Sequence, residues 1–218
     1  MRRAVARPAL GTELVTIRSR TISSAQMPLD IQALLRETGA LLSGHFRLSS
    51  GLHSSGYVQC ALLLEHPHNA TRIGEELAAR LGDASIERIV APALGGLVIG
   101  YAVAQALSVP MIFTERKDGQ MVLRRGFTIG EARRCAVIED VVTTGKSTRE
   151  AARVVEAAGA EVISYGSILN RSGVGNPFDH PYQALLSLSL DTWTEPECPL
   201  CGDGVPLDTP GSRFTQAS

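Results

Sequence analysis

The stretch that most constrains the fold is "CAVIEDVVTTGKST", residues 135–148. Its apolar run, Ala136 to Ile138, fits the interior of a sheet, and two adjacent carboxylates, Glu139 and Asp140, follow at the end of that strand. A turn and a helix with hydroxyl and glycine residues at its start come next. Because α/β sheets bind ligands at the carboxyl ends of their strands, this stretch predicts a site where the carboxylates meet the helix N-terminus.

The spacing of this stretch excludes a nucleoside-triphosphate loop. The residues "GKS" at 145–147 match the end of G-x-x-x-x-G-K-[ST], but the first glycine of that pattern falls at Asp140. Paired carboxylates beside an anion-binding helix start instead fit a sugar diol with a phosphate nearby. On local pattern alone a structural interpretation stays open, in which the carboxylates cap the strand and Thr144 caps the helix.

The remaining chain predicts one α/β domain. Helices are expected from Asp30 to Gly39, from near Asn69 to residue 83, from Gly96 to Leu107 and over 145–160; strands are expected at 89–92, 109–116, 133–142 and 160–170. Residues 45–64 read as short strands joined by Ser/Gly turns, and 117–127 as a hairpin arm. Strands alternating with helices in this way predict a central, mostly parallel sheet flanked by helices.

Composition predicts the boundaries of the domain and the cellular compartment of the protein. Residues 27–190 are expected to form the domain, 1–26 a disordered extension with five Arg and one acidic residue, and 191–218 a Pro/Gly-rich tail. The extension fits either an inert segment before Met27 or a targeting peptide. A net charge of −1 predicts no nucleic-acid or membrane partner, and the four cysteines are too few for a disulfide framework. We expect a cytoplasmic protein.

The segment "VIEDVVTTGKS" resembles the phosphoribosyl pyrophosphate (PRPP) motif of type I phosphoribosyltransferases. The resemblance implies that family's fold, with a small N-terminal hood and a mobile hairpin arm. It also implies that Glu139 and Asp140 hold the ribose hydroxyls, with Asp140 catalytic. The residues that it implies for the 5′-phosphate are Val142, Thr143, Thr144, Gly145, Lys146 and Ser147. Lys146 either adds charge to that loop or points to solvent.

The segment "HFRLSSGLHSSGYVQ", residues 45–59, resembles the N-terminal part of orotate phosphoribosyltransferases. The residues that this resemblance implies for orotate are Phe46, Ser50, Gly51, Thr143 and Arg171. A guanidinium such as that of Arg171, at the end of a strand, meets a carboxylate with two parallel hydrogen bonds. Taken singly, the Ser/Gly segment is equally an ordinary turn, and Arg171 a solvated surface charge.

The segment "FTERKDGQMVLRRGF", residues 113–127, resembles the arm that the family closes over PRPP. Arg116 and Lys117 match the Arg-Lys pair at its head, which implies PRPP-binding and catalytic roles. Arg124 and Arg125 also lie in this arm, which is shorter than in other members. In some members lysines occupy the positions of Ser49 and Gly95. Which cation meets the departing pyrophosphate therefore stays open, and a solvated hairpin is the alternative.

Together these resemblances predict transfer of the phosphoribosyl group from PRPP to orotate, which gives orotidine 5′-monophosphate and pyrophosphate in de novo pyrimidine (UMP) biosynthesis. They imply Mg²⁺ as cofactor, held mainly by PRPP, and a homodimer whose lid is shared across subunits. The alternatives are a phosphoribosyltransferase for another base and a non-catalytic PRPP-sensing regulator.

The tail carries the pair Cys198 and Cys201, spaced C-x-x-C. One such pair supplies two ligands, whereas a structural zinc ion takes four, so the others must come from a partner subunit or from a His such as His180. A tail turn or a subunit contact is the alternative interpretation, and a redox role lacks the usual strand-to-helix context.

Overall fold

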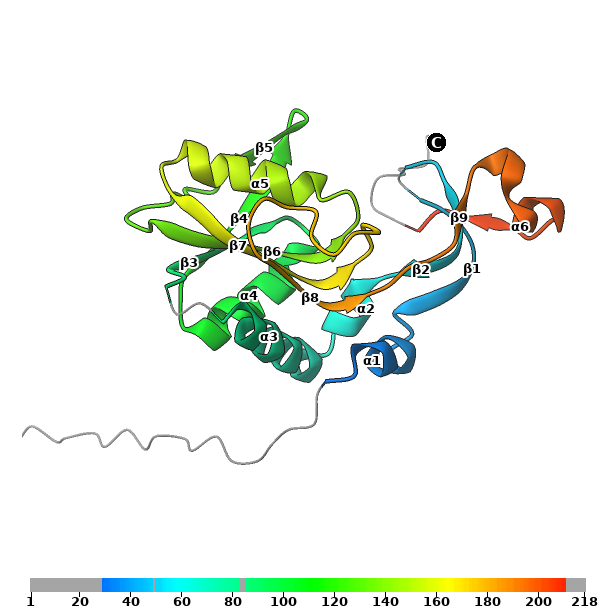
Figure 1. Ribbon diagram of the computed structural model, residues 1–218, viewed down its shortest axis with the longest axis horizontal. Helices are drawn as coiled ribbons and strands as arrows, with labels where there is room; N and C mark the ends of the chain where they lie inside the picture. Colours follow the sequence, from blue (N-terminus) through cyan, green and yellow to red (C-terminus); the bar gives the residue numbers. More distant parts are fainter. Residues whose placement is uncertain (1–28, 49, 83–84, 211–218) are drawn as a thin grey trace, which may run out of the picture.

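The computed structural model describes residues 29–48, 50–82 and 85–210, and these form two sheets joined side by side (Figure 1). In chain order the elements are α1 (Ile31–Glu37), β1 (Leu41–Arg47), β2 (His53–Val58), α2 (Cys60–Leu64), α3 (Pro67–Leu81), β3 (Arg88–Pro92), α4 (Gly96–Leu107), β4 (Met111–Lys117), β5 (Gln120–Leu123), β6 (Arg134–Val142), α5 (Lys146–Ala157), β7 (Glu161–Asn170), β8 (Tyr182–Ser187), β9 (Thr192–Trp193), the 3-10 turn η1 (Glu195–Glu197), α6 (Pro199–Gly202) and β10 (Leu207–Asp208).

The larger sheet has the strand order β5-β4-β3-β6-β7-β8, and all its pairs are parallel except β4 with β5. Helices α3 and α4 cover one face and α5 the other (Figure 1). Successive residues of β6 serve the two faces: Val137 packs in the cluster that contains α5, and Ile138 in the cluster that contains α3 and α4. The predicted mostly parallel α/β sheet is confirmed.

The smaller sheet, which we call the hood, has the order β10-β1-β2-β9. Strands β9 and β10 come from the segment expected to be a tail, and they pair with the two edges of the β1–β2 hairpin. A lone two-stranded hairpin is marginally stable in water, so these short strands complete a sheet that the N-terminal segment cannot form alone. Residues 1–26, expected to be disordered, lie outside the described residues.

Three local expectations differ from the structure. The segment "CALLL" is helix α2 and not part of a strand. Helix α3 begins at Pro67, two residues before the expected start, because the fixed φ of proline suits the first helical position. Strand β8 was not predicted at all, since its half-buried residues lack the alternation that marks a strand.

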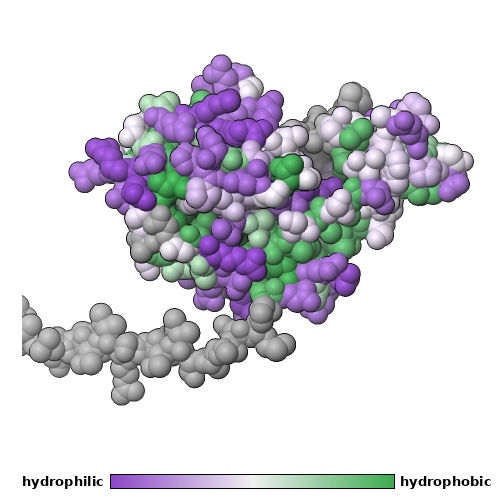
Figure 2. Space-filling model, viewed as in Figure 1, coloured by the Kyte–Doolittle hydropathy of each residue, from purple (hydrophilic) through white to green (hydrophobic). Residues whose placement is uncertain are grey.

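The arm is the β4–β5 hairpin, which projects beyond the sheet (Figure 1). Asp118 and Gly119 form its two-residue turn with φ of 50° and 82°, the left-handed geometry that matches strand twist. Figure 2 shows hydrophilic residues over β5 and α5, and hydrophobic ones gathered near α2, where the hood joins the larger sheet. Within the described residues, every helix is too short or too polar to cross a membrane.

Candidate active site

The two predicted carboxylates lie near the carboxyl end of β6, which continues past them to Val142. Glu139 is buried, with 7% of its surface exposed, and Asp140 is partly buried. The Asp140 carboxylate accepts a hydrogen bond from the Val141 N–H at 2.8 Å, and that of Glu139 accepts one from the Asp140 N–H at 3.3 Å. Their own backbone therefore orients both groups.

The turn between β3 and α4 lies directly against these carboxylates. A Cβ atom added to Gly95 would lie 2.6 Å from Asp140 Oδ1, and one added to Gly96 would lie 2.8 Å from the Ile138 carbonyl oxygen. Only glycine allows so close an approach of backbone to carboxylate. At position 95, where some members of the resembling family carry lysine, a side chain would force Asp140 to move.

Burial changes the protonation of this pair. It raises the pKa of Glu139 well above its usual value, and the neighbouring Asp140 charge adds to that rise. Burial also raises the pKa of Asp140, but the hydrogen bond between the two side chains opposes that rise. Glu139 and Asp140 therefore titrate as a coupled pair in which burial favours the neutral form.

Glu139→Gln is expected to raise the melting temperature at pH 7.5 by about 2–5 °C. A carboxyl with a raised folded-state pKa loses a proton first in the unfolded chain, so its burial costs stability increasingly as the pH rises above about 4.3. The gain should shrink as the pH is lowered from 7.5 toward 5. Thermal melts of both proteins across this range test it, and a gain independent of pH contradicts the assignment.

The predicted phosphate loop joins β6 to the start of α5. Gly145 precedes the helix with φ of 70°, and Thr143, Thr144 and Lys146 are exposed. Arg149 fixes the loop by donating to the Thr144 carbonyl at 2.6 Å and to that of Pro177 at 3.2 Å. The loop is therefore held in place at the start of a twelve-residue helix, whose first N–H, that of Lys146, donates to the Thr144 hydroxyl at 3.3 Å.

Arg171 lies next to this loop. Its backbone N–H donates to the Val142 carbonyl at 2.7 Å, which sets it at the end of β6. Its side-chain Nε is buried and has no hydrogen-bond partner within the described part of the chain. Burial lowers the pKa of the Arg171 guanidinium. A buried, unpartnered donor of this kind indicates a ligand acceptor.

Two residues that were not predicted as site residues connect Arg171 to the carboxylates. Burial raises the pKa of the Cys60 thiol; the charges of Asp140 and Glu139 raise it further, whereas that of Arg171 lowers it. Burial also raises the pKa of Tyr57, with the same opposed effects of Asp140 and Arg171. Cys60 and Tyr57 thus each lie within electrostatic range of both Arg171 and Asp140. Tyr57 was visible in the sequence only as an aromatic residue of the resembling segment, and Cys60 gave no signal.

The other predicted orotate residues lie in the hood. Phe46 is buried and packs on Tyr57, with ring centroids 5.9 Å apart. Ser50 and Gly51 are exposed in the β1–β2 turn. Their hydrogen bonds stay within that turn: the Ser50 hydroxyl accepts from the Leu52 N–H at 3.4 Å, and the Gly51 N–H donates to the Leu48 carbonyl. Their contact with orotate stays a prediction.

The arm cations fall into two classes. The Arg116 guanidinium forms an ion pair with Glu150 of α5 and donates to the Gly119 carbonyl at 2.8 Å. Arg125 holds Glu115 with two hydrogen bonds, of 2.8 and 2.9 Å. Lys117 and Arg124 are exposed and form no ion pair with the described residues. Two cations are thus free to meet a ligand, and Arg116 is attached to the helix that begins at the loop.

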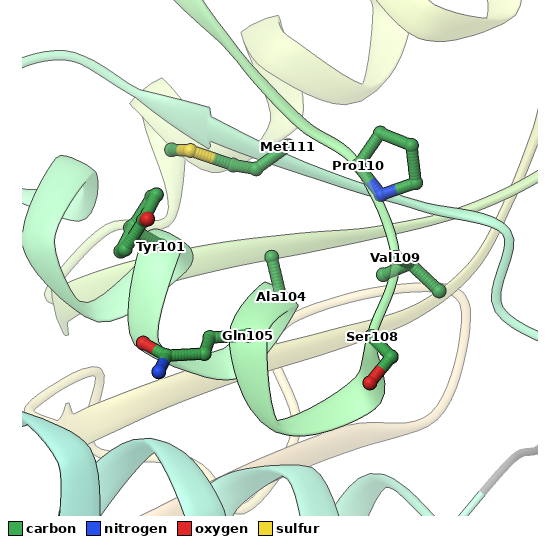
Figure 3. Close-up of a pocket in the computed structure, with 7 residues that line it drawn as sticks. All are labelled: Tyr101, Ala104, Gln105, Ser108, Val109, Pro110 and Met111. Carbon is green, nitrogen blue, oxygen red and sulfur yellow. The ribbon is translucent and has the colours of Figure 1, made fainter. Parts of the chain in front are cut away.

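A surface pocket of about 310 Å³ lies elsewhere, between the end of α4 and the start of β4 (Figure 3). Its lining residues are Tyr101, Ala104, Gln105, Ser108, Val109, Pro110 and Met111. None of them is charged, and none belongs to the carboxylate edge. This pocket lacks the groups that recognise a phosphorylated sugar.

Comparison with known proteins agrees with the geometry. Residues 63–197 match the family described as "Phosphoribosyl transferase domain". An orotate phosphoribosyltransferase of Thermotoga petrophila is 47% identical over 84% of this chain and 98% of its own, and one of Carboxydothermus hydrogenoformans is 46% identical over 85% and 98%. The crystal structure of orotate phosphoribosyltransferase from Aeropyrum pernix superposes with a TM-score of 0.61 at 24% identity, over 72% of this chain and 93% of that one.

Proposed function

The chain belongs to the orotate phosphoribosyltransferases, and we propose that the edge formed by Glu139, Asp140 and the 142–147 loop is where it works. The enzyme transfers the phosphoribosyl group from PRPP to orotate, which gives orotidine 5′-monophosphate and pyrophosphate in pyrimidine biosynthesis. The buried, unpartnered Nε of Arg171, whose backbone N–H bonds to the Val142 carbonyl at the end of β6, is the observation that carries the assignment of the site.

PRPP lies with its ribose hydroxyls on Asp140 and Glu139 and its 5′-phosphate on the loop. The carboxyl oxygens of Asp140 and Glu139 accept hydrogen bonds from the diol. The N–H groups at the start of α5 and the hydroxyls of Thr143, Thr144 and Ser147 receive the phosphate. Exposed Lys146 adds a positive charge beside it.

Orotate lies between Arg171 and Tyr57. The guanidinium of Arg171 donates to the orotate carboxylate, which satisfies the buried Nε. Phe46 packs on Tyr57, so the two rings offer aromatic surface to the pyrimidine. Ser50, Gly51 and Thr143 complete the polar edge of the base.

The arm stabilises the departing pyrophosphate. Lys117 forms no ion pair with the described residues, and Arg116 becomes available once its ion pair with Glu150 opens. When the arm closes, Arg116 therefore exchanges the Glu150 carboxylate for phosphate oxygens of pyrophosphate. We assign a homodimer in which the arm covers the neighbouring subunit's site. The exposed apolar residues Leu94, Val98 and Tyr101, on and just before α4, supply a surface for that contact.

Magnesium fits this site as a PRPP-bound cofactor. The described residues offer two adjacent carboxylates here and no acidic cage, and Mg²⁺ takes one or two carboxylates with substrate phosphates and waters. PRPP would mainly hold the ion, beside Asp140 and Glu139, and the ion would neutralise charge on pyrophosphate. All four cysteines are free, which supports a cytoplasmic location. With a net charge of −1, no nucleic-acid partner is proposed.

Arg171→Ala is expected to raise the KM for orotate and to lower kcat/KM about 30- to 100-fold, because a charged, buried hydrogen bond is lost. The assay follows the absorbance decrease of orotate with PRPP and Mg²⁺. Arg153→Ala, which removes an exposed Arg of α5, is the control and should behave as wild type. Unchanged orotate kinetics in Arg171→Ala would show that Arg171 does not bind orotate. Turnover of another base instead would assign the site to that base.

A further inference from the structure

Four metal-binding side chains meet inside the hood, away from the carboxylate edge. They are His45 of β1, His53 of β2, and Cys198 and Cys201 on either side of the start of α6. One ligand atom from each lies within 4.8 Å of all the others. This is the one such group within the described residues, and His180, considered from the sequence, does not belong to it.

The spacing of these atoms is close to that of a tetrahedral zinc site. With Zn–N of about 2.05 Å and Zn–S of about 2.3 Å, neighbouring ligand atoms lie about 3.4 Å (N to N) and 3.6 Å (N to S) apart. In the hood, His45 Nε2 lies 3.4 Å from Cys198 Sγ and 3.6 Å from Cys201 Sγ. His53 Nδ1 lies 3.2 Å from Cys201 Sγ and 2.9 Å from His45 Nε2. These four distances lie within about 0.5 Å of the tetrahedral spacing.

The second nitrogen of His45 is already engaged in the way a metal ligand requires. His45 Nδ1 lies 2.8 Å from the Val205 carbonyl oxygen, which accepts only and therefore fixes the proton on Nδ1. The lone pair of Nε2 then faces the two thiols and His53. Ligating histidines usually make such an outer hydrogen bond, because it orients the ring and selects the tautomer.

Burial of the group demands an explanation. His45, His53 and Cys198 expose 3%, 2% and 4% of their surface, although the hood is small. Neither hydrophobic cluster of the described residues includes a residue from 191–210, so this segment lies outside both cores. Small units that lack a core commonly rely on a metal or a disulfide instead.

We propose that His45, His53, Cys198 and Cys201 bind one Zn²⁺ ion in a structural site. Two sulfur and two nitrogen ligands in tetrahedral spacing select zinc among common metals, and four protein ligands leave no open position for a substrate. The ion connects the last described segment to the hairpin that carries Phe46 and Tyr57. It stabilises the wall of the orotate pocket without taking part in the reaction.

The test measures metal directly, so its result does not depend on the proposed activity. Full-length protein, expressed in zinc-supplemented medium and purified with reductant, should contain about one zinc per chain by mass spectrometry. Cys201→Ser and His53→Asn should lose that ion, whereas Cys135→Ser and His68→Asn, outside the group, should keep it. Chelation should lower the melting temperature by about 5 °C or more, and added zinc should restore it.

Cobalt replaces zinc as a spectroscopic probe and covers the case in which a variant fails to fold. Wild-type protein reloaded with Co²⁺ should show the strong visible bands of tetrahedral cobalt and thiolate-to-metal charge transfer in the ultraviolet. A reduced wild-type chain that binds neither zinc nor cobalt overturns the proposal, and the four side chains are then only hydrogen-bonded. Retention of zinc by both Cys201→Ser and His53→Asn also overturns it, because the ion then lies elsewhere.

Discussion

Asp140→Asn is expected to lower kcat/KM for PRPP by about 10³-fold or more while the protein remains folded. The amide keeps the shape that fits against Gly95. It is uncharged, so it cannot form charge-assisted hydrogen bonds with the ribose hydroxyls or offset positive charge on C1. Because burial raises the pKa of Asp140, a neutral replacement should not lower the melting temperature. The two effects separate a catalytic role from a structural one.

Steady-state kinetics with PRPP varied at saturating orotate, together with a thermal melt, measure both effects. Glu161→Gln removes an exposed carboxylate from the start of β7 and is the matched control. Near wild-type turnover in Asp140→Asn would show that the carboxylate edge is not where PRPP reacts. A parallel loss of activity and of stability would instead assign Asp140 to the fold.

Gly145→Ala is expected to weaken PRPP binding and to lower kcat/KM about 10²- to 10³-fold, because the phosphate loop must shift. At φ of 70° an added Cβ would lie 2.9 Å from Arg149 Nη1 and 3.0 Å from the Phe178 ring. Arg149 is the group that anchors the loop to Pro177, so the clash acts on the loop itself. The backbone conformation alone costs about 1–2 kcal/mol of stability.

Gly159→Ala is the matched control for Gly145→Ala. Gly159 has φ of 88° at the end of the same helix, but nothing lies within 4 Å of its added Cβ. Both variants should lose similar stability, and only Gly145→Ala should lose PRPP affinity, measured by isothermal titration. Equal PRPP affinities in the two variants would show that the loop does not bind the phosphate.

The sequence was most informative where local pattern and function coincide. Residues 136–148 contain a strand, the two carboxylates, a turn and the start of a helix in one contiguous stretch. The apolar run of the strand, Gly145 and the helix start therefore all indicated the same site. The hairpin arm was equally local, because Asp118-Gly119 is a turn signal between alternating residues. Resemblance to a family then supplied Arg171, whose surroundings no local pattern describes.

What the sequence did not reveal depends on contacts between distant segments. The close approach of Gly95 to Asp140 exists only after β3 and β6 pair, and Cys60 comes within electrostatic range of the carboxylates and Arg171 only in the folded chain. His45 and His53 are ordinary residues of a hairpin until Cys198 and Cys201 reach them. The spacing of residues along the chain does not predict these long-range contacts.

Because β1 pairs with β10, the hood can be completed only late in translation. His45 and its acceptor Val205 are 160 positions apart, so the first strands of the hood leave the ribosome long before their partners. At roughly 5–20 residues per second, the β1–β2 hairpin waits about 8–30 s without its edge strands. The first sheet to be translated is therefore the last to be completed, and a nascent chain exposes its unpaired edges to chaperones throughout that interval.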